Sequence, residues 1–393
     1  MSISPARLGL SRMTPREANE PHRVASSLEL FFDLVFVIAV SSAASNLHHA
    51  LTEGHHEHGV TSFAIMFFCI WWAWMNFTWF ATSFDVDDWL YRVLTITQMG
   101  GVVVFSAGIS TAFTEGDFTV CVIGYVIMRI CMATQWFRAG ISNPDYRITT
   151  FRYGFGILIA QALWVGWLLL FSHAPYATLL MVPLWILELS VPIFAETAKT
   201  SKTTPWHPHH ITERYSLFTL VILGEGLLGS ANAIIEGTSE VEALHRLIAV
   251  AVLALVGTAA LWWIYFWPPH HGLIGSFRQS LTYGYVHYFV FAAAAAFAAG
   301  IELLVNVETG HGELGERGAS LAIAIPVALF LLGIWFIVIR HIKDSVVNTA
   351  MLGGAVLVFA DVLIPFPAVW TCAVLVGIVA TLVVRRRSAE AMH

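Results

Sequence analysis

Acidic residues lie inside apolar stretches of this sequence, where an ionised side chain is costly unless it is paired or hydrated. The clearest example is the segment 210–231, HITERYSLFTLVILGEGLLGSA, in which Glu225 follows Glu213 after twelve residues. On a helix this spacing puts Glu225 roughly 18 Å beyond Glu213, near the middle of a bilayer whose hydrocarbon core is about 30 Å thick. We therefore predict Glu225 as the centre of a buried site for a cation or a proton.

His210, Glu213 and Arg214 stand at the polar start of the same segment. Their i, i+3 and i+4 spacing places them on one face of a helix, where histidine and glutamate can share a metal ion. The imidazole of His210 can also titrate near neutral pH. The alternative is an ordinary helix entrance, in which Arg214 extends to the lipid headgroups.

Glu29 and Asp33 are four residues apart and share one face at the start of an apolar segment. They are candidates for a cation or proton site that faces Glu213. Glu29 is equally explained as an acid at a helix start, where Ser26 or Ser27 forms the cap. Asp33 lies one turn deeper among phenylalanines, which favours a functional interpretation for this residue.

Arg129 and Glu188 also lie within apolar segments. Arginine stays charged at physiological pH, so we expect Arg129 to pair with a carboxylate rather than to face lipid. Such a pair would either fix helix packing or leave a remaining acid, such as Glu225, to relay protons or ions. His287, the one histidine well inside an apolar segment, completes the predicted ion-binding residues.

Histidines crowd the segment after the first apolar run, at His48, His49, His55, His56 and His58. Such a tract can bind zinc or copper weakly, or it can be a solvated loop. The sequence predicts no cofactor: the three lysines, at 199, 202 and 343, all fall in polar loops, which excludes a Schiff-base pigment within the membrane. It also contains no phosphate-binding loop, no nucleophile elbow and no basic surface for nucleic acid.

The composition identifies the elements that must position these residues. Of the 393 residues, 57% are hydrophobic and 12% are charged, and the mean hydropathy is +0.72. A soluble domain has about twice that charged share, and apolar runs of about 20 residues predict membrane-spanning helices. We predict an all-α integral membrane protein with twelve transmembrane helices, at 28–48, 61–84, 89–113, 118–138, 152–172, 176–196, 212–236, 244–267, 280–303, 317–340, 346–363 and 366–384.

The positions of lysine and arginine predict the orientation of these helices. With the N-terminus inside, 17 of the 20 basic residues fall in inner segments, two in outer loops and one, Arg129, within a helix. Such a bias is what the positive-inside rule requires. We therefore predict that both termini are cytoplasmic.

Two stretches six helices apart are similar to each other. Residues 29–38 read ELFFDLVFVI and residues 213–222 read ERYSLFTLVI, and a tryptophan pair occurs in the next helix of each half, at 71–72 and 262–263. This pattern predicts two parallel six-helix repeats. The predicted boundaries are 1–24 for a cytoplasmic N-terminal segment, 25–197 for the first half, 198–211 for a cytoplasmic linker, 212–385 for the second half and 386–393 for a cytoplasmic tail.

Several motifs together resemble the bacterial low temperature requirement A family. They are ELFFDLVFV at 29–37, WWAW at 71–74, DVDDWLYR at 85–92, HITERYSLFTLVILGE at 210–225, WWIYF at 262–266 and YGYVHYF at 283–289. The similarity extends over about residues 24–385. It implies a multi-pass bacterial membrane protein and does not imply a biochemical activity.

The buried acids favour a secondary transporter or channel-like permease of the bacterial cytoplasmic membrane, moving a proton, a cation or a small solute. Two alternatives stay open. One is a membrane-embedded enzyme that acts on a lipid or isoprenoid, with His210 and Glu213 as acid and base. The other is a sensor of pH or metal that transports nothing. The predicted partners are the lipid bilayer and a small ion or solute.

Overall fold

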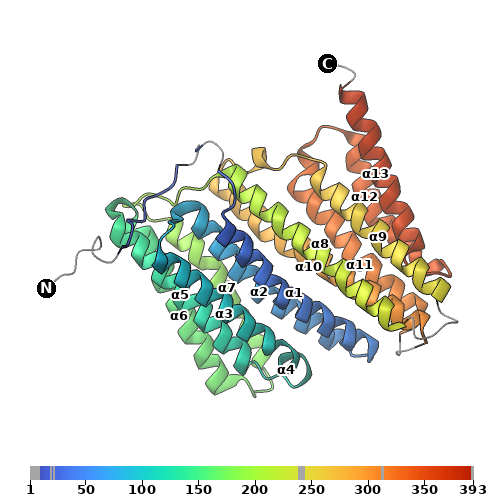
Figure 1. Ribbon diagram of the computed structural model, residues 1–393, viewed down its shortest axis with the longest axis horizontal. Coiled ribbons are helices and arrows are strands. Elements are labelled where there is room, and N and C mark those ends of the chain that lie inside the picture. The colour runs from blue at the N-terminus through green and yellow to red at the C-terminus, as the bar shows by residue number, and fades with distance from the viewer. Residues whose placement is uncertain (1–8, 18–19, 21–22, 238–243, 311–313, 391–393) are drawn as a thin grey trace. The chain divides into compact units, whose positions relative to one another are not determined.

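The structure consists of α-helices joined by short loops and 3₁₀ turns, as predicted (Figure 1). This computed structural model describes residues 9–17, 20, 23–237, 244–310 and 314–390, so the predicted segments 1–24 and 386–393 lie partly outside it. The helices are α1 (Ser27–Thr52), α2 (His56–Phe84), α3 (Trp89–Ala107), α4 (Ile109–Thr114), α5 (Thr119–Ser142), α6 (Arg147–Phe171), α7 (Ala177–Glu196), α8 (Pro208–Gly237), α9 (Leu244–Phe266), α10 (Phe277–Glu308), α11 (Glu316–Ile337), α12 (Ser345–Leu357) and α13 (Val369–Glu390). The short α4 directly continues α3, and each of the other helices overlaps one of the twelve predicted segments.

The helical fold is what a lipid environment requires, because only helices and closed barrels satisfy the backbone hydrogen bonds internally. In the described part of the chain, ten helical segments are long and apolar enough to cross a membrane. The remaining long helices are α8, which carries Glu213, Arg214 and Glu225, and α13, whose apolar part is short. The prediction of an all-α membrane protein is therefore confirmed, with ten candidate spans among the twelve long helices.

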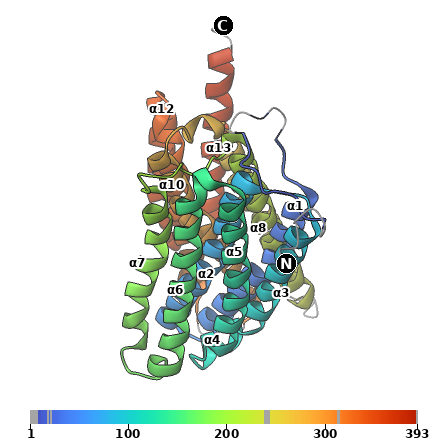
Figure 2. The ribbon, with the colours of Figure 1, turned by 90° about the vertical axis from the view of Figure 1, so that its left-hand side faces the viewer.

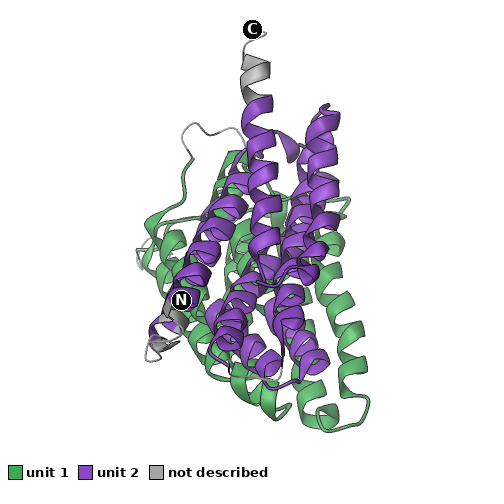
Figure 3. Cartoon of the chain, turned by 90° about the vertical axis from the view of Figure 1, so that its right-hand side faces the viewer, with its two compact units in different colours: residues 1–39, 69–214 green, residues 40–68, 215–393 purple. Residues whose placement is uncertain are grey.

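The chain divides into two compact units (Figure 3). Unit 1 comprises residues 1–39 and 69–214, and unit 2 comprises residues 40–68 and 215–393. The divisions fall inside α1, α2 and α8, so each of these three helices contributes residues to both units.

In unit 1, helices α3, α5, α6 and α7 pack against one another in chain order (Figure 2). The approach of α3 to α5 depends on glycine. A Cβ atom at Gly124 would lie 2.4 Å from the backbone nitrogen of Phe105 and 2.6 Å from the carbonyl oxygen of Gly101. Small residues allow membrane helices to pack this closely, so Gly124 fixes the spacing of the pair.

Carboxylates fix the loop between α2 and α3 in unit 1. Asp88 caps α3 by accepting a hydrogen bond from the Tyr91 amide at 3.0 Å, and it also pairs with Arg138 of α5. Burial opposes ionisation of Asp88, but the hydrogen bonds from Arg138 and from backbone amides lower its pKa. Asp87 pairs with Arg92 at 2.7 Å. The pair between Asp88 and Arg138 attaches this loop to α5.

In unit 2, α10 packs closely against α11. A Cβ atom at Gly300 would lie 2.6 Å from the carbonyl oxygen of Ala322. Asp361, a buried acid that sequence reasoning missed, has a structural role at the start of α13. Its carboxylate accepts hydrogen bonds from the amides of Ala368, at 2.8 Å, and Thr371, at 3.0 Å. These bonds satisfy helix-terminal amides that would otherwise lack partners.

Candidate functional site

Arg214, near the start of α8, lies fully buried between two carboxylates of α1. Its Nη1 is 2.9 Å from Glu29 Oε1, its Nη2 is 2.5 Å from Asp33 Oδ1, and its Nε donates to Asp33 Oδ2 at 3.1 Å. His210 Nε2 lies 3.2 Å from the same Glu29 oxygen. These four side chains, which belong to unit 1, are termed the Arg214 cluster, and none of them is more than 2% exposed.

Helix geometry explains how the sequence builds this cluster. α1 begins with a capping box, in which Ser26 Oγ accepts from the Glu29 amide at 3.3 Å and Glu29 Oε2 accepts from the Ser26 amide at 2.8 Å. The four-residue spacing puts Asp33 beside Glu29, and the same spacing brings the two basic residues of α8 together. Trp74 of α2 donates its indole N–H to Asp33 Oδ1 at 2.7 Å, which holds that carboxylate in place.

When Glu29 and Asp33 are both ionised and His210 is neutral, the Arg214 cluster contains one more negative than positive charge. Two carboxylates face one guanidinium, so the net charge is −1, and one additional proton on His210 brings it to zero. Neither ring nitrogen of His210 has a hydrogen bond of good geometry among the described residues, but Nε2 lies 3.2 Å from the Glu29 carboxylate. The negative charge of that carboxylate favours the single proton of a neutral ring on Nε2 and leaves no proton on Nδ1. That nitrogen is the position at which the ring can take a second proton.

Other charged groups of unit 1 lie close to the cluster. Arg23 pairs with Asp85 at 3.5 Å, and Glu213 accepts a hydrogen bond from the Ala25 amide at 3.2 Å. Burial raises the pKa of Asp85, repulsion from Glu29 raises it further, and Arg23 opposes both effects. Glu29 thus contacts the basic residues of α8, and Glu213, which the sequence suggested as the facing group, lies close enough for the two carboxylates to repel each other.

A second buried group lies in unit 1 around Glu188 of α7. Arg129 Nη2 donates to Glu188 Oε2 at 2.7 Å, Trp72 Nε1 donates to the same oxygen at 2.9 Å, and Gln161 Nε2 donates to Oε1 at 2.9 Å. Glu188 is therefore the carboxylate partner that the sequence required for Arg129. The positive and negative charges of this Glu188 cluster (Trp72, Arg129, Gln161 and Glu188) cancel without any further ion.

His287 of α10 takes part in a reciprocal network in unit 2 with Tyr265, His270 and Tyr283. His287 Nδ1 lies 2.7 Å from the Tyr283 carbonyl and Nε2 lies 3.1 Å from the Tyr265 hydroxyl. His270 Nε2 lies 3.0 Å from the Tyr265 carbonyl and Nδ1 lies 3.0 Å from the Tyr283 hydroxyl. A carbonyl only accepts, so each ring donates to a carbonyl, and a neutral ring then accepts from the hydroxyl at its other nitrogen. Burial lowers the pKa of His270 to about 4, in agreement with this assignment.

The histidines at the end of α1 and the start of α2 differ in their surroundings. His48 is buried in unit 2, where it accepts a hydrogen bond from Asn306 Nδ2 at 2.8 Å and lies 3.5 Å from Glu302. The others, His49, His55, His56 and His58, are exposed. Within the described ranges, no group of three His, Cys, Asp or Glu side chains is arranged to hold a metal ion.

The structure therefore brings together only part of the predicted site. Glu29, Asp33 and His210 converge on Arg214, which one of the two sequence interpretations placed among the lipid headgroups. That alternative is wrong, because the Arg214 side chain is fully buried. Glu225 is half-buried and lies further along α8, in unit 2, so its central role stays a prediction.

Comparison with known proteins identifies the group to which the chain belongs. The family model described as bacterial low temperature requirement A protein (LtrA) matches residues 24–384. The chain is also 29% identical over 269 residues to the Rhizobium meliloti (strain 1021) protein called uncharacterized protein RA0937. That match covers 64% of this chain and 60% of the relative, so the chain spans about three fifths of the relative's length. The chain is thus a multi-pass membrane protein with buried charged residues that belongs to the bacterial low temperature requirement A family.

Proposed function

We propose that the protein is a proton-coupled permease and that the Arg214 cluster is its proton site. The observation that carries this proposal is that the Glu29 and Asp33 carboxylates face the single guanidinium of Arg214, with His210 beside Glu29. With both acids ionised, the charge of the cluster is −1 with neutral His210 and zero after one proton is added. A buried ion pair with a structural role needs no surplus charge, and a surplus charge inside a membrane protein is costly. A group that gains and loses one proton has two states of different charge, and such states are what coupling to transport requires.

The tight burial of the cluster supports a proton over a larger cargo at this position. A proton needs one basic atom, whereas a solute needs a cavity of its own size. The Glu29 and His210 side chains are at most 1% exposed, which also argues against acid–base chemistry on a lipid, because a substrate has to reach the catalytic groups. A cation or small solute coupled to the proton would use another part of the path.

In the proposed cycle, Arg214 keeps Glu29 and Asp33 ionised, and His210 alone changes its protonation state. Proton uptake at His210 Nδ1 gives Glu29 two cationic partners, His210 and Arg214. These two cations compete for the Glu29 carboxylate, so the pairing of Glu29 with Arg214 is weakened. Glu225, further along α8, is the second acid of the proposed path. Four further residues stay candidates for ion binding on the sequence argument: Glu213, Glu188, Arg129 and His287.

Proton flux into liposomes tests the proposal directly. Vesicles containing the purified protein and an internal pH dye are given an inside-negative potassium diffusion potential at several external pH values. We expect flux well above that of empty vesicles, and we expect His210→Gln to abolish most of it. Glutamine is neutral, as the unprotonated imidazole is, so this variant keeps the resting charge of the cluster and should fold.

The matched control is His55→Gln, which replaces an exposed histidine outside the cluster and should leave the flux unchanged. Asp33→Asn should also abolish flux, because it fixes the cluster at zero charge without a proton. Wild-type flux in the His210→Gln protein, or wild-type flux no higher than that of empty vesicles, would contradict the proposal.

We also propose that both termini face the cytoplasm and that the two six-helix halves are parallel repeats. The positions of 17 of the 20 basic residues support the orientation, and the similarity of residues 29–38 to 213–222 supports the repeat. Parallel halves place the linker 198–211 on the same side as both termini.

Cysteine labelling with a membrane-impermeant reagent checks this arrangement. In a background without the four native cysteines, His55→Cys should react in intact cells. Lys202→Cys, in the linker, and Lys343→Cys, between α11 and α12, should react only after the membrane is permeabilised. All three positions are exposed. A cysteine that fails to react in intact cells is therefore on the inner side of the membrane, because burial in the protein does not protect it. Labelling of Lys202→Cys in intact cells would overturn the parallel arrangement.

A further inference from the structure

Unit 2 contains a pocket at one end of its helices, and no part of the proposed proton path uses it. Its volume is about 690 Å³. It is bounded by the turn after α9, the first turns of α10 and the segment where α11 ends. Because α10 and α11 are candidate membrane spans, a pocket at their ends lies near the boundary between hydrocarbon and headgroups.

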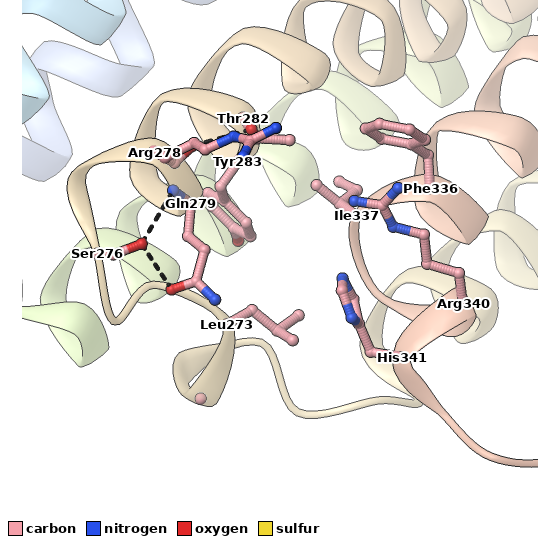
Figure 4. Close-up of a pocket in the computed structure, with 11 residues that line it drawn as sticks. Leu273, Ser276, Arg278, Gln279, Thr282, Tyr283, Phe336, Ile337, Arg340 and His341 are labelled. Carbon is pink, nitrogen blue, oxygen red and sulfur yellow. Dashed lines mark hydrogen bonds between the residues drawn. The ribbon is translucent and has the colours of Figure 1, made fainter.

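The polar side of this pocket is basic. Arg278 comes from α10, and Arg340 and His341 come from the segment after α11. Figure 4 shows the two guanidinium groups and the imidazole extending toward the same gap from different walls. The lining contains no Asp or Glu. Among the described residues, neither arginine forms an ion pair with a carboxylate, whereas Arg385 on α13 pairs with Asp344 at 2.7 Å.

The other side of the pocket is apolar. Leu273, Phe336 and Ile337 line it, and Phe336 also positions one of the arginines. The Arg340 guanidinium carbon lies 3.8 Å from the centre of the Phe336 ring, a cation–π contact that limits the conformations of this long side chain. A ligand that fits both sides has an anionic group joined to an apolar portion.

We propose that this pocket binds the phosphate group of an anionic phospholipid, with the apolar part of the lipid against Leu273 and Phe336. Guanidinium groups bind phosphate oxygens with paired hydrogen bonds, so Arg278 and Arg340 can hold one phosphate between them. Basic pockets at helix ends and at headgroup depth are suited to this recognition. The alternative explanation of the two arginines is that they only orient the helices, in which case they require no ligand.

Lipid-dependent thermal stabilisation of the purified full-length protein in neutral detergent tests the proposal. The probes are a short-chain phosphatidylglycerol, a phosphatidylcholine of the same chain length, and inorganic phosphate. We expect phosphatidylglycerol to raise Tm in a saturable way, and we expect its apparent affinity to fall about tenfold for each of Arg278→Gln and Arg340→Gln. Arg340→Lys, which keeps the charge but loses the paired geometry, should have a smaller effect.

The matched control is Arg385→Gln, which removes a basic residue of unit 2 that lies outside the pocket and should leave the lipid affinity unchanged. An unchanged affinity in the Arg278→Gln/Arg340→Gln double variant would overturn the proposal, and so would equal stabilisation by phosphatidylcholine. Saturable stabilisation by inorganic phosphate, as strong as that by phosphatidylglycerol and lost in the same variants, would show a free-phosphate site and overturn the lipid assignment. Each outcome is independent of the proton flux, so it also separates this site from the proposed function.

Discussion

Replacing Arg214 with glutamine is expected to produce the largest loss of stability of any single substitution in unit 1. The change leaves Glu29 and Asp33 ionised, close together and buried without a cation. Removing one partner of a buried ion pair typically destabilises a protein by about 3–5 kcal/mol, and here two carboxylates lose their partner. That loss is comparable with the whole stability of many domains, so we expect Arg214→Gln protein to aggregate on extraction.

Size-exclusion profiles and thermal denaturation in detergent measure this effect. The matched control is Arg92→Gln, which also breaks an arginine–aspartate pair. Arg92 and Asp87 are 59% and 76% exposed, so water replaces the lost contact and little change is expected. The triple variant Glu29→Gln/Asp33→Asn/Arg214→Gln removes all three charges, and it should recover much of the folding without recovering proton flux. An Arg214→Gln protein that melts like the wild type would show that Glu29 and Asp33 are not ionised as assigned.

The helices could be predicted from the sequence because each depends on local information. An apolar run bounded by polar or charged residues sets the position of a membrane helix, and no tertiary contact is needed to detect it. The capping box at α1 is of the same kind, since Ser26 and Glu29 are three residues apart. Glu29 and Asp33 were recognised as a pair for the same reason, because their spacing alone puts them on one face.

The partners within the site could not be predicted in the same way. Arg214 contacts Asp33 from 181 residues further along the chain, and nothing around Arg214 distinguishes it from an arginine at a helix entrance. Trp74 and Gln161 were missed for a related reason, because indole and amide groups inside apolar helices usually have no functional role. Glu225 was selected for its depth, its acidic side chain and its place in the motif 210–225, although the charge environment of an acid depends on helices that packing brings beside it.

The two buried clusters of unit 1 differ in charge when their acids are ionised, and the proposed function rests on this difference. The Arg214 cluster carries a surplus negative charge, whereas the Glu188 cluster is balanced by Arg129 alone. A balanced pair gains nothing from a mobile ion, so the structural alternative for Glu188 and Arg129 is that they hold α5 and α7 together. The same argument predicts that proton flux survives when the charges of the Glu188 cluster are removed and is lost when those of the Arg214 cluster are removed.

Glu188→Gln and Arg129→Met are each expected to destabilise the protein by about 3–5 kcal/mol, because each leaves one buried charge without its partner. The double variant should lose far less, about 1–2 kcal/mol, since no charge remains and the glutamine oxygen can still accept from Trp72. The glutamine NH2 group can donate to Gln161 Oε1, which has no hydrogen-bond partner among the described residues, once the Gln161 amide is flipped. The Nε and Nη1 atoms of Arg129 have no hydrogen-bond partner among the described residues. Replacing Arg129 therefore leaves few acceptors unsatisfied. Thermal denaturation of the four proteins gives the coupling energy directly.

Proton flux in the same double variant then decides the role of the pair. If the Glu188 cluster only fixes helix packing, the folded double variant should transport protons at a rate near that of the wild type. The corresponding neutral variant of the Arg214 cluster should fold without transporting, which makes the two clusters controls for each other. A double variant that is stable but inactive would place Glu188 and Arg129 on the proton path, and one as unstable as the single variants would show that the two charges do not act as a pair.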